Sequence, residues 1–139
     1  MMITIAALAL ALTPVPLAGC EEAVARLTRA AGSDTRVVVS FTGSQNSLSQ
    51  LDSASDPRAE PSLFPVSPDL FVFTLNLRPY QISGFDAEAF ARRTCSLERS
   101  KGARFNGVMS FKRESMTKDG RTLFRENMID AVMAEFQSK

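Results

Sequence analysis

The sequence predicts a small, single α+β domain: a mostly antiparallel sheet of about four strands with two to three helices packed on it. Three observations predict this class. Residues 35–42 and 70–77 have the composition and alternation of strands, residues 86–97 have helical spacing, and Asp119-Gly120 joins two segments that pair as a hairpin. Helices and strands follow one another without a regular βαβ order or an internal repeat, which is typical of α+β domains.

The first segment has the pattern of an export signal. Residues 3–12 are apolar apart from Thr4, but they are too few to cross a bilayer as a helix, which takes about 20 apolar residues. Pro14 and Pro16 then interrupt any helix. A short apolar stretch followed by a helix breaker and small residues is typical of a secretory signal peptide, so we expect residues 1–19 to be removed.

The end of this segment, Leu17-Ala18-Gly19-Cys20, resembles the lipobox of bacterial lipoproteins: a branched apolar residue, two small residues and a cysteine. The resemblance covers only the N-terminal segment. It implies that residues 17–19 are the recognition sequence, that the chain is cut before Cys20, and that the Cys20 thiol carries a diacylglyceryl group. Acyl chains such as palmitate contribute about 0.8 kcal/mol per buried methylene, so several of them give a stable membrane anchor. The absence of aspartate after Cys20, where Glu21 stands, favours the outer membrane over the inner membrane.

Cys20 and Cys95 are the two cysteines of the chain, and two outcomes follow for them. If Cys20 is lipidated, Cys95 is a lone thiol in an oxidising compartment, either buried and inert or paired with another chain. If Cys20 is not lipidated, a Cys20–Cys95 disulfide forms in a soluble periplasmic protein. The sequence leaves Cys95 free, buried or paired.

After the signal, we expect residues 20–34 to form the lipid anchor and a short helix or tether. Good helix formers follow Cys20, with acids in the first turn and Gly32 as a stop. The domain itself, residues 35–139, then begins with the strand 35–42, whose three consecutive valines predict a central position in the sheet.

Residues 44–69 are predicted to form a long loop rich in serine and proline. A loop of this length inside a small domain is usually functional or disordered. Within it, Leu63, Phe64 and Val66 lie between prolines, as in an extended segment that packs or binds a partner.

The next strand and helix have clear signals. Between residues 70 and 77, alternate positions from Phe71 to Leu77 are apolar, so one face of this strand is core. Asp86 is placed to cap the helix 86–97, with a hydrophobic staple between Phe85 and Phe90. Cys95 lies beside the apolar stripe of this helix.

The hairpin prediction fixes a register about Asp119-Gly120. It places Thr117 opposite Thr122, Met116 opposite Leu123, Glu114 opposite Arg125, Arg113 opposite Glu126 and Phe111 opposite Met128. The register pairs opposite charges and apolar side chains, which supports it.

Beyond Glu126 the pattern has two interpretations. We expect Asn127 to cap a C-terminal helix that carries Met128, Ile129, Val132, Met133 and Phe136. The alternative is one helix over residues 122–136, because apolar residues recur there every four positions.

Charge is distributed unevenly along the chain. Residues 20–69 hold seven acids and four arginines, a balance of −3, whereas residues 86–125 hold ten bases and five acids, a balance of +5. The basic half contains a candidate patch for an anionic partner, formed by Arg92, Arg93, Arg99, Lys101 and Arg104. A solvated face with paired charges is the alternative interpretation.

Chemistry-bearing residues are few. The chain has no histidine, which removes the usual triad base and the commonest metal ligand, and it has no glycine-rich phosphate-binding loop and no Gly-x-Ser-x-Gly nucleophile motif. We therefore expect no metal, no cofactor and no enzymatic activity. A pair of carboxylates such as Asp86 and Glu88 is the remaining candidate for a hydrolase, but both fit better as cap and first-turn acids.

These observations predict an exported, lipid-anchored protein of the cell envelope that faces the periplasm or the cell surface. We expect it to act as a non-enzymatic binding or scaffolding module whose partners are the membrane, through the lipid, and an envelope protein or polyanion, but not nucleic acid. The alternatives are an accessory lipoprotein of a secretion or surface-appendage machine and a carboxylate-dependent envelope hydrolase.

Overall fold

The computed structural model describes residues 19–134, without the side chains of residues 52–53 and 98–101. Its helices are α2 (Cys20–Ala30), α3 (Gln45–Ala54) and α4 (Ala87–Lys101), with short 3₁₀ turns η1 (Pro57–Ala59) and η2 (Pro79–Gln81). Its strands are β1 (Thr35–Gly43), β2 (Ser62–Ser67), β3 (Leu70–Leu77), β4 (Arg104–Lys118) and β5 (Arg121–Met133).

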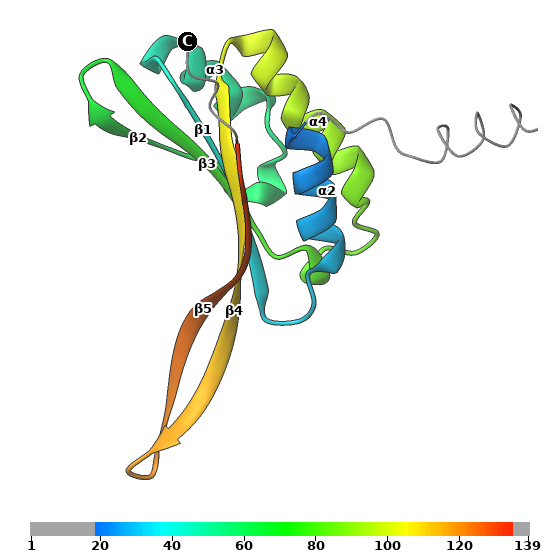
Figure 1. The fold of residues 1–139 in the computed structure, drawn as a ribbon, viewed down its shortest axis with the longest axis vertical. Coiled ribbons are helices and arrows are strands. Elements are labelled where there is room, and N and C mark those ends of the chain that lie inside the picture. The colour runs from blue at the N-terminus through cyan, green and yellow to red at the C-terminus, as the bar shows by residue number, and fades with distance from the viewer. Residues whose placement is uncertain (1–18, 135–139) are drawn as a thin grey trace, which may run out of the picture.

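The five strands form one antiparallel sheet in the order β2-β3-β1-β4-β5. Helices α2, α3 and α4 lie against one face of this sheet, and no helix of residues 19–134 covers the other face (Figure 1). The α+β class and the antiparallel sheet are confirmed, with five strands instead of about four. The central position predicted for residues 35–42 is also confirmed, because β1 is the middle strand.

The core lies between the helices and β1 with its two neighbouring strands. Val37, Val39 and Phe41 alternate along β1 and are fully buried on the helix side. The Phe41 ring lies 6.5 Å from the ring of Phe73 on β3 and 5.9 Å from the ring of Phe105 on β4, measured between centroids. Such aromatic pairs contribute about 0.5–1.5 kcal/mol each beyond their buried area, so this row links the three central strands.

The prediction of a loop over residues 44–69 is wrong, because this segment holds α3, η1 and β2. Ser44 caps α3 by accepting a hydrogen bond of 3.1 Å from the backbone N–H of Ser47. Leu48 and Leu51 of α3 are completely buried. Two leucines three positions apart in a polar segment therefore place one face of α3 in the core and its other faces in water.

β2 explains the additional strand. It pairs with β3 from Ser62 to Ser67, with a register shift after Pro65. Proline has no N–H to donate, but an edge strand needs only one of its two sides paired. Leu63 is half-buried while Phe64 and Val66 are exposed, so this segment packs through one face, as expected for an edge strand.

α2 is part of the domain and not a tether. Val24 and Leu27 are buried, and the hydroxyl of Thr28 donates to the carbonyl of Val24 at 2.7 Å, which satisfies it inside the core. α2 runs antiparallel to α4, since Cys20 is bonded to Cys95 at one end and Arg29 forms an ion pair with Glu88 at the other.

The predicted features of α4 are confirmed. Asp86 accepts a hydrogen bond of 3.1 Å from the backbone N–H of Ala89, as an N-cap does. The rings of Phe85 and Phe90 lie 5.5 Å apart, which is the expected staple. Gly102 ends the helix at a φ of 74°, in the left-handed region that glycine adopts without strain.

The hairpin register is confirmed at all five predicted pairs. Asp119 and Gly120 both have positive φ, 52° and 72°, as a type I′ turn requires. The helix predicted from Asn127 is wrong, and so is the alternative helix over residues 122–136, because β5 continues as a strand to Met133. Phe136 lies outside the described residues.

One bulge separates the two halves of β5. Phe111 pairs with Met128 and Ser110 pairs with Asp130, so Ile129 has no partner on β4. Pairing between β1 and β4 ends at Thr35 and Lys112, yet the hairpin continues beyond this point. Residues 114–125 therefore form a two-stranded arm that projects from the domain (Figure 1).

Candidate docking face on the uncovered side of the sheet

The face of the sheet opposite the helices is the most distinctive surface of the described chain. Alternation along β1 directs Arg36, Val38, Ser40 and Thr42 to this side, because the residues between them are buried under the helices. We call this surface the open face. Its other members are the residues paired with those four on β3 and β4, and the residues of β4, β5 and the arm that lie on the same side of the sheet. They include Val72, Asn76, Met109, Phe111, Arg113, Phe124, Glu126, Met128 and Met133.

The side-chain amide of Asn106 stabilises the open face near the bulge between β1 and β4. Asn106, beside a bulge in the pairing of β1 with β4, accepts a hydrogen bond of 3.0 Å from the hydroxyl of Thr42. Its amide nitrogen donates to the hydroxyl of Ser40 at 3.2 Å. The side-chain amide is therefore satisfied on both sides, which fixes the bulge.

Large apolar side chains remain exposed along β5. Phe124 is 58% exposed, Met128 57% and Met133 58%. A contiguous exposed apolar surface with a polar rim is a common mark of a protein-interaction site. Methionine side chains are flexible and polarisable, which suits them to contact with a partner of irregular shape.

Arginines gather where the arm leaves the domain. Arg36 of β1 reaches across β4 and binds Glu126 of β5 through two hydrogen bonds, 3.0 Å from Nε and 2.7 Å from Nη2. The same guanidinium lies 4.7 Å from the centroid of the Phe111 ring. The ring and the carboxylate together hold the Arg36 side chain in one orientation.

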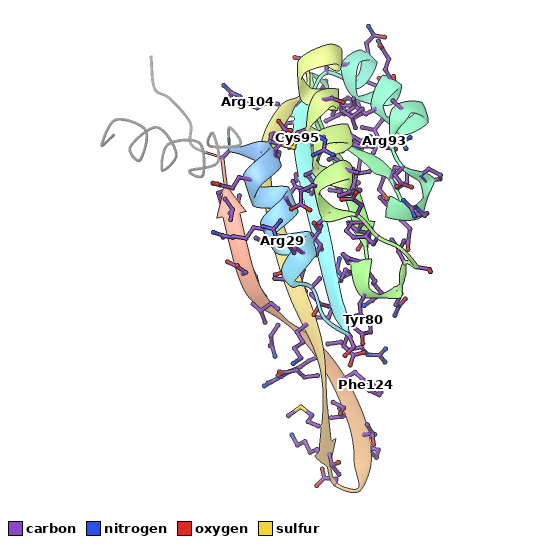
Figure 2. The ribbon with its side chains drawn as sticks, turned by 90° about the vertical axis from the view of Figure 1, so that its right-hand side faces the viewer. Arg29, Tyr80, Arg93, Cys95, Arg104 and Phe124 are labelled. Carbon is purple, nitrogen blue, oxygen red and sulfur yellow. A yellow bond between two sulfur atoms is a disulfide. The ribbon has the colours of Figure 1, made fainter. Side chains whose placement is uncertain are left out.

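A second arginine is held by the neighbouring aromatic residue. The guanidinium of Arg113 lies 4.1 Å from the centroid of the Phe124 ring, which Figure 2 shows at the base of the arm. Arg78 follows β3 and lines, with Arg113, Phe124, Arg125 and Glu126, a depression of about 350 Å³. We call Arg36, Arg78, Arg113 and Glu126 the arginine cluster.

The electrostatics of Glu126 follow from this arrangement. The hydrogen bonds from Arg36 hold the pKa of the Glu126 carboxyl below its ordinary value, and the nearby charges of Arg36, Arg78 and Arg113 act in the same direction. Partial burial opposes them. Glu126 therefore stays ionised at neutral pH, and three guanidinium groups around one carboxylate leave the cluster with a net charge of +2.

The basic patch predicted from sequence is dispersed where the structure describes it. Arg92 and Arg93 are exposed on α4, and Arg93 donates to the carbonyl of Ala54 at 3.2 Å. Arg104 begins β4, and Figure 2 places it on the other side of Cys95 from Arg93. The side chains of Arg99 and Lys101 lie outside the described ones, so their part of the patch stays a prediction.

Cys20, the predicted lipidation site, is bonded to Cys95 in a disulfide with a Cα–Cα distance of 5.9 Å. A sulfur in a disulfide has no free thiol to carry a thioether, so the bridge and the lipid exclude each other in one molecule. Both cysteines are buried, at 5% and 1% exposure. Acylation of Cys20 would therefore also require this side chain to leave its buried position at the start of α2. The recognition sequence before Cys20 lies outside the described residues, apart from Gly19.

The carboxylates proposed for a hydrolase have structural partners. Asp86 and Glu88 both line a depression of about 460 Å³, together with Arg29 and Tyr80, which are labelled in Figure 2. Asp86 caps α4, however, and Glu88 forms an ion pair with Arg29. Their positions are thus explained by the contact between α2 and α4.

The described residues contain no cluster of three or more potential metal ligands. No helix among residues 19–134 has the length and apolar character needed to cross a membrane. The chain matches no known family model, and comparisons with curated proteins and with solved structures give no significant match.

Two of the four residues of the arginine cluster, Arg113 and Glu126, were paired correctly from the sequence. The hairpin register placed Arg113 opposite Glu126, and the structure confirms that pair. Arg36 and Arg78 were not predicted, because they lie 90 and 48 residues before Glu126 and no local signal joins them to the hairpin. The signal at Arg36 was weak: an arginine between Thr35 and Val37 at the second position of a strand.

Proposed function

We propose that this chain is an exported protein of the cell envelope that acts as a non-enzymatic binding or scaffolding module. Its binding surface is the open face together with the arm. The observation that supports this function best is the exposure of Phe124 and Met128 beside the arginine cluster, on the sheet face that no helix of the described residues covers. Leaving such apolar surface in water is unfavourable, and a partner that covers it removes that cost.

Export is supported by two features of the chain. The segment before Cys20 resembles a lipoprotein signal, and a buried disulfide is a feature of proteins from oxidising compartments. Because the bridge occupies the Cys20 sulfur, we propose a bridged protein without lipid on Cys20. The lipid-anchored form at the outer membrane is the competing proposal.

The absence of histidine and the structural roles of Asp86 and Glu88 support a role in binding over catalysis. Two further carboxylates that line described depressions also have local roles. Asp130 pairs with Arg26 at 3.7 Å, and Glu126 pairs with Arg36. These two positions are explained by packing without reference to a substrate.

The state of Cys20 is tested by comparing the full chain with its Cys20→Ser and Cys95→Ser variants in bacterial cells. Intact mass and membrane fractionation are the measurements. For the bridged form, the processed wild type is two hydrogens lighter than its reduced form, carries no acyl mass, and both variants fractionate like the wild type. An acyl mass that is lost in Cys20→Ser and retained in Cys95→Ser would instead show the lipid-anchored form.

The binding surface is tested by a photo-crosslinking amino acid placed at single positions in the same cells. Position 128 samples the open face, and position 89 on α4 is the matched exposed control on the helix side. We expect a discrete crosslinked species from position 128 and none from position 89. Crosslinks from position 89 alone would show that the open face is not the binding surface.

A further inference from the structure

We propose that the arginine cluster is a receptor for a side-chain carboxylate in an acidic segment of the partner protein, which lies across the open face. This inference rests on the proposed function, since it names the chemistry of the partner that covers this face. It assigns the recognition to Arg78 and Arg113, and it assigns Arg36 to positioning.

The division of roles follows from the donors that are already used. Arg36 directs Nε and Nη2 to the two oxygens of Glu126. Within residues 19–134, no hydrogen bond or ion pair engages the guanidinium of Arg78 or of Arg113, although both line the depression beside Glu126. Two guanidinium groups thus present unused donors in one place, and guanidinium binds carboxylate with two parallel hydrogen bonds.

The geometry of Arg113 prepares it for this contact. Its guanidinium lies over the ring of Phe124, so the ring covers one face of the guanidinium group. The N–H groups of a guanidinium lie in its plane and point outward from the edge, where a carboxylate is bound. Stacking also reduces the rotamer freedom that binding would otherwise remove.

The chemistry of the surroundings favours a carboxylate side chain as the occupant. With Glu126 counted, the arginine cluster keeps a net charge of +2, which attracts an anionic side chain such as a carboxylate. Exposed Phe124 lines the depression, and exposed Met128 lies two positions from Glu126 on β5. The two side chains offer apolar surface to the methylene groups of a glutamate and to an apolar neighbour. An acidic segment with interspersed apolar residues satisfies both features.

The test uses the full bridged chain and a capped hexapeptide of alternating glutamate and leucine as the probe. A glutamine–leucine hexapeptide is the uncharged control. Binding is followed by titration calorimetry and by the NMR signals of the arginine Nε–H groups. We expect the glutamate peptide to bind, to shift the signals of Arg78 and Arg113, and to bind more weakly as salt concentration rises.

Single substitutions distinguish a loss of carboxylate binding from a loss of folding. Arg78→Gln and Arg113→Gln should each reduce the affinity for the glutamate peptide about ten-fold or more, because each removes a charged hydrogen-bond partner. Arg92→Gln, an exposed arginine on α4, is the matched control and should leave the affinity unchanged. The thermal transition of each variant shows whether it is folded.

Three results would overturn the inference. They are equal affinity of all variants for the glutamate peptide, binding of the glutamine peptide as tightly as the glutamate peptide, and shifts of the Arg78 and Arg113 signals by phosphatidylglycerol vesicles or inorganic phosphate but not by the peptide. The last result would assign the cluster to phosphate groups. If crosslinking from position 128 persists in any of these cases, the proposed function stands and only the carboxylate receptor fails.

Discussion

Arg36 and Glu126 are bound to each other across an intervening strand, through hydrogen bonds of 3.0 and 2.7 Å that use both carboxylate oxygens. The two residues come from β1 and β5, which are not neighbours in the sheet. The pair therefore ties the edge strand to the central strand at the point where the arm begins.

This ion pair predicts a specific response to acid. The pKa of Glu126 is lower in the folded protein than in the unfolded chain, so the stability that the pair contributes is fully present above the ordinary glutamate value of 4.5 and is lost as pH falls through the lower folded value. Urea unfolding between neutral pH and pH 3 should show this loss. In Glu126→Gln the corresponding part of the pH dependence should be absent.

Glu60→Gln is the control for this experiment, since Glu60 is exposed and is not among the residues that line the depression beside Glu126. It should retain the acid dependence of the wild type. An identical acid dependence in Glu126→Gln and in the wild type would contradict the role of the pair.

The disulfide predicts a large dependence of stability on redox state. It closes a loop with a sequence separation of 75, and restricting an unfolded loop of this length stabilises the folded state by about 4 kcal/mol. Reduction of the wild type, or the Cys95→Ser substitution, should lower the free energy of unfolding by roughly this amount. Denaturant titrations with and without dithiothreitol measure it, and Cys95→Ser should not respond to the reductant.

We expect that the structure does not tolerate the addition of a single methyl group at Gly107. A Cβ there would lie 2.7 Å from the backbone oxygen of Val132, which cannot move without disturbing the pairing of β4 with β5. Gly107→Ala should therefore destabilise the protein by about 1–3 kcal/mol.

Gly32→Ala is the matched control, because a Cβ at position 32 meets no atom within 4 Å. Its effect should lie within about 0.5 kcal/mol of zero. Thermal unfolding of the two variants provides the comparison, and equal melting temperatures would show that β5 does not approach Gly107 as closely as described.

Because α3 packs into the core, we expect mutations in this segment to lower the stability strongly, although its composition is typical of a loop. Leu48 is completely buried, so Leu48→Ala should lower the free energy of unfolding by about 2–5 kcal/mol. Asn46→Ala, at an exposed position of the same helix, should change it little. A small effect of Leu48→Ala in chemical denaturation would mean that α3 does not belong to the core.

Structural features whose signals lie close together in the sequence were predictable, whereas features that join distant segments were not. The hairpin register was predictable because its signals lie close together: Asp119-Gly120 fixes the turn, and Arg113 and Glu126 confirm the pairing. The helix predicted beyond Glu126 failed for an equally physical reason. A spacing of four is compatible with one face of a helix and also with one face of a strand, as at Phe124 and Met128.

The choice between helix and strand was decided by β4. This strand has 15 residues, and its backbone groups need partners along most of that length, which β5 supplies as far as Met133. α3 was missed because two buried leucines in a serine-rich segment give a weak periodic signal. The open face was missed because it is formed by four strands, and no short stretch of sequence contains it.

The bridge between Cys20 and Cys95 has a mechanical consequence for a chain that is pulled from its N-terminus. Tension that enters α2 at Cys20 passes through the sulfur atoms to α4, so the residues between the two cysteines carry no load. Those residues would otherwise extend by about 260 Å. While the bridge is intact and the C-terminal end is held, the covalent path of the force therefore runs from α4 directly into β4 and β5, the two strands that form the arm.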